Sequence, residues 1–260
     1  MGQNFLTSVA ARQAIIRAAN LGPTTEDGLP YVLEIGPGKG FLTEALLETA
    51  GKEGKVVAVE KDDLLIEELA GKFEKEIKSG QLELIHGDIL DLAPRGGGQA
   101  SAPWGKDYKL VANIPYNITG EIIRTFLETE SQPQMMVLML QKEVAERIVA
   151  RNHHESILSI SVKAYAEPRY IQTVKAGSFF PKPKVDSAIL AIQNISKDNF
   201  KEVSEEKFFS IVKKGFAHKR KMLRSNLNCS EEFLKSCMIN PEARAEELTV
   251  KQWLYLSKNL

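Results

Sequence analysis

The chain has 260 residues, of which 43% are hydrophobic, and 34 basic and 34 acidic side chains give it a formal net charge of zero. This is the composition of an ordinary globular protein, large enough for one α/β domain and a small second domain. It excludes a membrane-spanning chain, because no apolar run approaches the length of a span, and no signal-peptide pattern is present. The two cysteines, Cys229 and Cys237, have no histidine nearby and predict neither a disulfide framework nor a metal site. We therefore expect a cytoplasmic protein.

Short apolar runs alternate with helical patterns over most of the chain. The predicted strands are 31–35, 55–60, 82–86, 108–112, 135–141, 170–174 and 188–193. The predicted helices between them are 40–50, 62–78, 119–130, 142–150 and 156–166. Continuous apolar strands separated by amphipathic helices indicate an α/β fold with a mostly parallel sheet covered on both faces. The last two strands are joined without a helix, so we expect them to pair as an antiparallel hairpin.

The character of the chain changes after residue 193. Residues 194–203 are polar and resemble a linker, and helical patterns follow to the end. We therefore predict one domain over residues 1–195 and a helical C-terminal domain over residues 196–260. The glycine-rich segment 96–103 has the composition of an exposed loop before the fourth strand.

A glycine-rich turn follows the first predicted strand, where residues 32–40 read Val-Leu-Glu-Ile-Gly-Pro-Gly-Lys-Gly. Gly36 and Gly38 can take a positive φ and let a ligand approach the backbone closely. The helix that follows offers unpaired N–H groups to a carboxylate or phosphate. This turn alone fits a dinucleotide enzyme as well as a methyltransferase.

Polar side chains come at the ends of the next strands. Glu60 ends the second strand and is placed to accept hydrogen bonds from ribose hydroxyls, and Asp88 follows the third strand, where it can accept from an adenine amino group. Each acid taken singly is more often a solvated surface group. However, the carboxyl ends of parallel strands converge on one crevice, and the order of these features favours a cofactor that contains adenosine.

The tetrapeptide Asn113-Ile114-Pro115-Tyr116 follows the fourth strand. A plain β-turn is the alternative, since Asn and Pro are both turn residues. The Asn113 side-chain oxygen and the Ile114 carbonyl can accept the hydrogens of an exocyclic amine, Pro115 restricts the backbone, and Tyr116 offers a flat face to a base. This sequence resembles the catalytic signature of enzymes that methylate an exocyclic nitrogen of a nucleobase. A dehydrogenase is disfavoured, because no residue is placed for hydride chemistry.

The motifs, taken in order over nearly the whole chain, resemble those of the ribosomal RNA adenine dimethyltransferases of the KsgA/RsmA type. The matching segments are 2–6 (Gly-Gln-Asn-Phe-Leu), 34–43, 113–118, 140–144 (Leu-Gln-Lys-Glu-Val), 179–187 (Phe-x-Pro-x-Pro-Lys-Val-Asp-Ser) and 216–224. The resemblance implies a Rossmann-like class I S-adenosylmethionine-dependent methyltransferase with a seven-stranded sheet. It implies transfer of methyl groups to N6 of two adjacent adenosines in a hairpin loop near the 3′ end of small-subunit (16S) rRNA.

The resemblance also implies roles for individual residues. The residues implied to bind the cofactor are Asn4, Leu6, Gly36, Gly38, Glu60, Asp88, Ile89 and Asn113. The catalytic residues would be Asn113, Ile114, Pro115 and Tyr116. Phe179 would hold the target base against Tyr116, or it is a core phenylalanine, and the residues themselves do not decide between these two interpretations.

The zero net charge does not by itself indicate a nucleic-acid-binding protein, but one segment is locally basic. We predict that it contacts RNA phosphates, in preference to forming only a solvated helix face, through Lys213, Lys214, Lys219, Arg220, Lys221 and Arg224. The implied partner is small-subunit rRNA within the immature small ribosomal subunit. We expect the protein to bind it as a monomer and to bind no membrane. Members of this family usually carry a basic tail before Asn4, whereas Met1 stands close to it here, so we assign no RNA contact to that end.

Two other functions remain as alternatives. An Erm-type enzyme, which methylates large-subunit rRNA and confers antibiotic resistance, shares the glycine-rich turn and the tetrapeptide, but segments 140–144 and 179–187 favour the KsgA/RsmA type. A non-catalytic RNA-binding or assembly factor on the same fold is disfavoured by the intact cofactor pocket.

Overall fold

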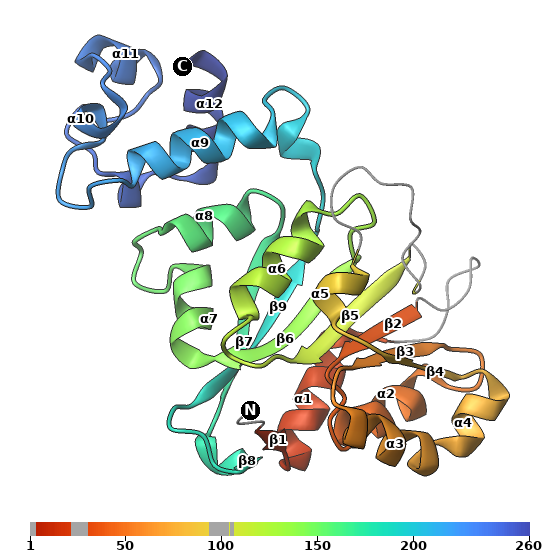
Figure 1. The fold of residues 1–260 in the computed structure, drawn as a ribbon. Coiled ribbons are helices and arrows are strands. Elements are labelled where there is room, and N and C mark those ends of the chain that lie inside the picture. Colours follow the sequence, from red (N-terminus) through yellow and green to blue (C-terminus); the bar gives the residue numbers. More distant parts are fainter. Residues whose placement is uncertain (1–3, 22–30, 94–103, 105–106) are drawn as a thin grey trace. The chain divides into compact units, whose positions relative to one another are not determined.

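The computed structural model describes residues 4–21, 31–93, 104 and 107–260 (Figure 1). The segment 96–103 that we expect to be a loop lies outside the described residues. Contacts divide the chain into two compact units, Met1–Ala145 with Arg169–Ile195, and Glu146–Pro168 with Ser196–Leu260. The end of the first unit falls where we place the domain boundary, but 146–168, which we place in the first domain, belongs by its contacts to the second unit. No helix in the described part of the chain is long and apolar enough to cross a membrane.

The first unit is built on a seven-stranded sheet with the strand order β4-β3-β2-β5-β6-β9-β7 (Figure 1). Its strands are β2 (Tyr31–Ile35), β3 (Val56–Glu60), β4 (Leu82–His86), β5 (Tyr108–Asn113), β6 (Met135–Gln141), β7 (Glu167–Val174) and β9 (Ser187–Gln193). Neighbouring strands pair in parallel along the row β4-β3-β2-β5-β6, and β9 pairs antiparallel to β6. The predicted mostly parallel α/β sheet is therefore confirmed.

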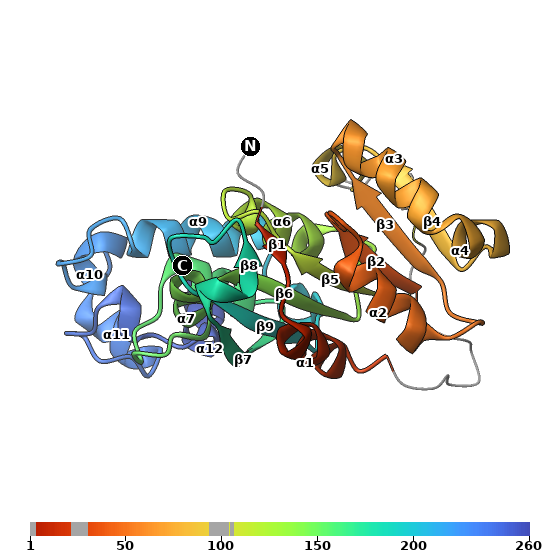
Figure 2. The same ribbon diagram turned by 90° about the horizontal axis from the view of Figure 1, so that it is seen from below.

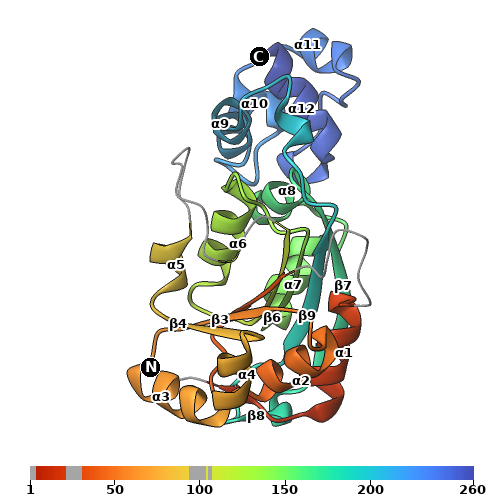
Figure 3. The same ribbon diagram turned by 90° about the vertical axis from the view of Figure 1, so that its right-hand side faces the viewer.

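Helices cover both faces of this sheet (Figures 2 and 3). They are α1 (Val9–Ala19), α2 (Phe41–Ala50), α3 (Asp63–Lys72), α4 (Glu74–Ser79), α5 (Ile89–Leu92) and α6 (Thr119–Glu128). A further helix, α7 (Lys142–Val149), contains the boundary between the two units. On one face, α1 and α2 bury Ile15 and Leu46 against alternate strand residues such as Val111. On the other face, Phe126 of α6 packs against Tyr108 and Trp104. This arrangement leaves the carboxyl ends of the parallel strands as the place where polar side chains gather.

Two local features differ from the predicted elements. The predicted helix 62–78 is two helices, because the chain bends at Phe73, which is 4% exposed and packs under Gly40. A two-stranded antiparallel ribbon, β1 (Phe5–Leu6) with β8 (Phe179–Phe180), is absent from the predicted elements, as is α1. A short 3-10 helix, η1 (Ala176–Ser178), precedes β8.

The second unit is helical. It contains α8 (Ile157–Lys163), η2 (Asp198–Phe200), α9 (Glu205–Gly215), α10 (Leu223–Leu227), α11 (Glu231–Ser236), η3 (Ala245–Glu247) and α12 (Val250–Asn259). Its core includes Phe208 and Trp253, both fully buried, and the Trp253 ring lies so close to Gly215 that a Cβ there would be 2.3 Å from it.

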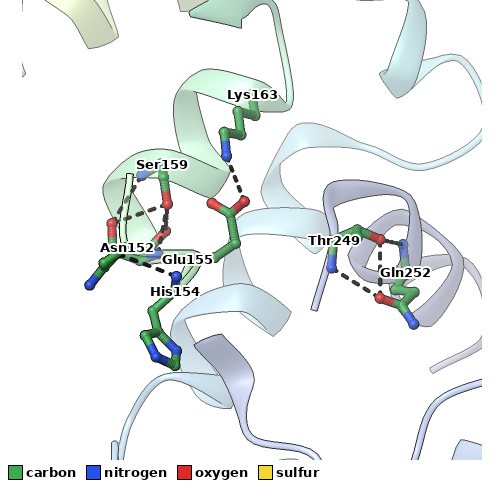
Figure 4. A network of polar contacts seen from close by, with 8 residues as sticks. Asn152, His154, Glu155, Ser159, Lys163, Thr249 and Gln252 are labelled. Carbon is green, nitrogen blue, oxygen red and sulfur yellow. Dashed lines mark hydrogen bonds and ion pairs between the residues drawn. The ribbon is translucent and has the colours of Figure 1, made fainter. Parts of the chain in front are cut away.

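Polar caps fix where two of these helices begin (Figure 4). Ser159 accepts a hydrogen bond from the Ser156 backbone at 2.6 Å, which completes a capping box at the start of α8. Gln252 does the same for Thr249 at the start of α12, at 3.0 Å. Such caps satisfy the N–H groups that a helix start leaves unpaired.

Candidate functional site

The glycine-rich turn leaves the carboxyl end of β2 and enters α2. Gly36, Gly38 and Gly40 have φ values of +65°, +59° and +74°, which only glycine adopts without strain. A Cβ on Gly36 would meet no atom within 4 Å, so the space over this residue is open. A Cβ on Gly38 would lie 3.0 Å from the ring of Phe5. The turn is therefore open at Gly36 and covered by the N-terminal segment at Gly38.

Glu60 ends β3 beside this turn and is 4% exposed. Its carboxylate accepts hydrogen bonds from the backbone N–H of Gly38 at 3.1 Å, of Lys61 at 2.9 Å and of Asp62 at 3.0 Å. These three donors stabilise a buried negative charge and tie the glycine-rich turn to the end of β3. A carboxylate has about four acceptor sites, so it retains capacity for a ligand hydroxyl.

Asp88 and Ile89 follow the end of β4, next to Glu60. Asp88 caps α5 by accepting from the Leu90 N–H at 2.9 Å, and it forms an ion pair with Lys61 at 2.7 Å. The hydrogen bond to Asp88 and its charge raise the pKa of the Lys61 ammonium above its ordinary value. Ile89 is 4% exposed and begins the short helix. Both predicted residues thus lie just after β4, the strand that pairs with the strand of Glu60.

The predicted catalytic tetrapeptide begins at the last residue of β5. Asn113 donates a hydrogen bond from Nδ2 to the backbone carbonyl of Asn4 at 3.1 Å, which leaves Oδ1 as its acceptor. The N–H of Ile114 donates to the carbonyl of Met139 at 3.1 Å, and within the described part of the chain no hydrogen bond reaches the Ile114 carbonyl. Asn113 and Ile114, at the end of β5, therefore each keep an oxygen that can accept a hydrogen bond.

Tyr116 is fixed by its hydroxyl, which forms a hydrogen bond with Ser187 Oγ at 2.8 Å. Ser187 is the first residue of β9 and is fully buried. Pro115 is exposed, and its carbonyl accepts from the N–H of Ile118 at 3.2 Å, which closes a turn. The turn and the Ser187 contact together hold the half-buried Tyr116 ring in place.

The N-terminal segment joins this site to the ribbon of β1 and β8. Leu6 pairs with Phe179, and both are buried, at 7% and 4% exposed. Phe179 belongs to the main core cluster of the first unit. Its burial agrees with the interpretation of Phe179 as a core phenylalanine, because its ring presents no exposed face to a base.

The basic segment lies in the second unit, at the end of α9 and in the connection to α10. Five of its six cationic side chains are exposed, namely Lys213, Lys214, Lys219, Arg220 and Lys221. Arg224 differs, because it forms an ion pair with Glu231 at 2.7 Å. The segment therefore presents five cations to solvent, and Arg224 is held by an acid.

Two residues of this region carry no role in the sequence prediction. Ser187, which holds Tyr116, ends the matching segment 179–187, but nothing in the sequence predicts its contact. Glu34 lies within β2 and is 1% exposed. Burial raises its pKa to about 8, an effect that the Thr43 side chain opposes and the Glu60 charge adds to. An acid within an otherwise apolar strand is the signal that could have found it. No group of three or more His, Cys, Asp or Glu that could hold a metal occurs among the residues described.

Comparisons with known proteins show which family the chain resembles. The family model for ribosomal RNA adenine dimethylases matches residues 1–260. Ribosomal RNA small subunit methyltransferase A of Dehalococcoides mccartyi is 40% identical over 97% of this chain and 84% of its own length. The protein of the same name from Nostoc punctiforme is 39% identical over 99% of this chain and 93% of its own length.

Two solved structures share the fold. A dimethyladenosine transferase from Plasmodium falciparum has a TM-score of 0.75 and 25% identity, and covers 97% of this chain and 95% of its own. The 23S rRNA methyltransferase ErmE has a TM-score of 0.74 at 23% identity, over 99% of this chain and 100% of its own. The second likeness shows the fold alone.

Proposed function

Because this chain belongs to the ribosomal RNA adenine dimethylase family, we propose that it dimethylates N6 of two adjacent adenosines in a hairpin loop near the 3′ end of small-subunit (16S) rRNA, during ribosome biogenesis. The methyl donor is S-adenosylmethionine, and the product is N6,N6-dimethyladenosine. The observation that carries this proposal is the position of Asn113. Its side chain lies at the end of β5, fixed by Asn4, in the same row of strand ends as the glycine-rich turn and Glu60.

The residues at the strand ends fit S-adenosylmethionine. The open space over Gly36 and the free start of α2 suit the carboxylate of the methionine part. Glu60 suits the ribose hydroxyls, and Asp88 with the backbone at Ile89 suits the adenine. Asn4 and Leu6 close the same region from the N-terminal segment. When bound, this cofactor supplies an electrophilic methyl group on a sulfonium.

Asn113 and Ile114 act on the acceptor. The amine of adenine is a poor nucleophile, because its lone pair is delocalised into the ring. Asn113 Oδ1 and the Ile114 carbonyl accept its two hydrogens and draw the nitrogen towards a tetrahedral geometry, with the lone pair aimed at the methyl group. Orientation of this kind supplies most of the catalysis. No strong base is required, because the nitrogen becomes far more acidic once it is alkylated and releases its proton to water.

Tyr116 holds the target base. The adenine must leave its stack, which costs a few kcal/mol and least in an unpaired loop. Stacking on an aromatic ring returns about 1–3 kcal/mol per base. The hydrogen bond to Ser187 fixes the ring before the base arrives, so little entropy is lost on binding.

The exposed lysines and Arg220 of the second unit are the proposed contacts to rRNA phosphates. The partner is the immature small ribosomal subunit, which the chain binds as a monomer in the cytoplasm. The named relatives, which are small-subunit enzymes, support this substrate over the large subunit.

The test is methyl transfer from labelled S-adenosylmethionine to purified, unmethylated small and large ribosomal subunits, with the product nucleosides digested and identified. We expect dimethyladenosine in the small subunit alone. Label confined to the large subunit would assign an Erm-type activity. No label on either, with cofactor binding intact, would leave a non-catalytic binding factor.

A further inference from the structure

The ribbon of β1 and β8 has one buried and one outward face. Successive residues of a strand point to opposite faces, and residues directly opposite in a pair share a face. Leu6 and Phe179 form the buried face, and Phe5 pairs with Phe180 on the outward one. Phe180 is 72% exposed, whereas Phe5 is half-buried against the glycine-rich turn. The outward face therefore ends in an aromatic ring that is open to solvent.

Two exposed cations follow this ring in the sequence. The segment 180–185, which we call the ribbon loop, reads Phe-Pro-Lys-Pro-Lys-Val and contains no acid. Lys182 and Lys184 are exposed, and neither forms an ion pair within the described part of the chain. The nearest acid in the sequence, Asp186, is paired with Lys175 at 2.9 Å and accepts from the Ala176 N–H at 3.0 Å, and these contacts hold the pKa of its carboxyl below the ordinary value. The ribbon loop thus carries two exposed cations and one exposed aromatic ring within five residues.

The ribbon loop is attached to the predicted catalytic tetrapeptide at both ends. Before it, β8 pairs with β1, next to Asn4, whose carbonyl holds Asn113. After it, Ser187 forms the hydrogen bond that holds Tyr116. Two prolines restrict the backbone between these anchors. The position of Phe180 is therefore tied to that of the tetrapeptide through short, specific contacts on both sides.

We propose that Phe180 stacks an unpaired rRNA base next to the target adenosine, while Lys182 and Lys184 bind the adjoining phosphates. The inference rests on the proposed function and adds a residue that selects and positions the substrate. An aromatic ring with flanking cations is the combination that holds single-stranded nucleic acid, because the ring takes a base and the lysines take the backbone. A protein partner is disfavoured, since the cores of protein interfaces are depleted in lysine.

The experiment compares Phe180→Ala, Phe180→Trp and the double change Lys182→Ala with Lys184→Ala. Leu64→Ala is the control for the ring, because Leu64 is a large apolar side chain on α3 that is 78% exposed. Lys52→Ala with Lys75→Ala is the control for the charges, since both lysines are exposed on the first unit. Affinity for S-adenosylmethionine is measured for every variant and reports on folding of the cofactor pocket.

We expect Phe180→Ala to raise the KM for unmethylated small subunits on the order of tenfold, with cofactor affinity unchanged. Phe180→Trp should keep the wild-type KM, because tryptophan also offers a flat aromatic face. The double change Lys182→Ala with Lys184→Ala should lower RNA affinity and reduce the slope of log affinity against log salt by about two counterions. The two control variants behave like the wild type.

A spectroscopic readout isolates the stacking. A protein-free hairpin RNA carries 2-aminopurine in place of a nucleotide next to the target adenosines, and we expect its fluorescence to be quenched by the wild type and by Phe180→Trp but not by Phe180→Ala. Quenching that survives in Phe180→Ala at every flanking position would overturn the inference. The inference would also be overturned if Phe180→Ala lost affinity for the intact subunit but kept its affinity for the hairpin RNA, because the ring would then contact a ribosomal protein. Absence of methyl transfer by the wild type would instead refute the proposed function.

Discussion

Asn113 donates its side-chain hydrogen bond to the backbone of Asn4 at 3.1 Å, although 109 positions separate the two residues in the sequence. The bond fixes the nitrogen of the Asn113 amide towards Asn4 and leaves its oxygen as an acceptor. A residue near the start of the chain thereby sets which atom a substrate amine meets at the end of β5.

The first prediction concerns Asn113 itself. We expect Asn113→Ala to keep S-adenosylmethionine affinity within about tenfold, or 1.4 kcal/mol, while methyl transfer falls by orders of magnitude. The reason is that the amide oxygen acts on the acceptor amine more than on the cofactor. Calorimetry with the cofactor and single-turnover methylation measure the two quantities separately. Equal losses in both would mean that Asn113 mainly builds the cofactor pocket.

The second prediction separates the two roles of Tyr116. Tyr116→Phe keeps the ring and loses the Ser187 contact, which is worth about 1 kcal/mol, so the methylation rate should fall about fivefold. Tyr116→Ala also loses the stacking face and should cost roughly a hundredfold or more. Ser187→Ala should match Tyr116→Phe, and combining the two changes should add nothing further. Additive losses would show that Ser187 and Tyr116 act independently.

The third prediction follows from the buried acid Glu34. Its folded pKa of about 8 lies above the ordinary 4.5, so the folded chain keeps a proton that the unfolded chain loses between these values. The resulting stability is fully present below pH 4.5 and declines as pH rises towards 8, by about 1.4 kcal/mol per pH unit. Glu34→Gln should remove this decline.

Denaturant unfolding of the wild type and Glu34→Gln at several pH values between 5 and 8 tests this. The difference in free energy of unfolding between them should shift in favour of the variant as pH rises. Glu67→Gln, on the exposed surface of α3, is the control and should show no such trend. A constant difference for Glu34→Gln across the range would show that Glu34 is ionised in the folded chain.

The fourth prediction contrasts two glycines. Gly215→Ala places a Cβ 2.3 Å from the buried Trp253 ring, and we expect a loss of about 1–3 kcal/mol in the stability of the second unit. Gly71→Ala, in α3, meets no atom within 4 Å and should stabilise the chain by up to about 1 kcal/mol, since alanine favours a helix. Thermal unfolding of both variants measures the contrast. A Gly215→Ala variant as stable as the wild type would show that the ring can move aside.

The fifth prediction concerns the basic segment. Changing Lys219, Arg220 and Lys221 together to Ala should weaken RNA binding and reduce the slope of log affinity against log salt by about three counterions. Arg224→Ala should change the slope less than a single change of Lys219, Arg220 or Lys221 to Ala, because the ion pair with Glu231 already neutralises the charge of Arg224. Filter binding at several salt concentrations measures the slopes, and an unchanged slope for the triple variant would place the RNA surface elsewhere.

Several elements could be predicted from the sequence by itself. The strands Tyr31–Ile35, Leu82–His86 and Met135–Gln141 have the predicted bounds, because each is a mainly apolar run that is bounded by polar or turn residues. The family and its chemistry were also predicted, since glycine-rich turns and the Asn113 tetrapeptide are local patterns. Helix α1 could have been found from its Ser8 cap and the spacing of Ala11, Ile15 and Ala19.

Only the tertiary structure decided the rest. A strand of two residues has no period, so nothing in the sequence shows that β1 pairs with β8. That pairing turns Phe179 into the core and Phe180 out to solvent, because neighbours along a strand point to opposite faces, and the partner Leu6 settles which face is buried. The bend at Phe73, the bond from Asn113 to Asn4 and the neutralisation of Arg224 by Glu231 depend in the same way on residues that meet only when the chain has folded.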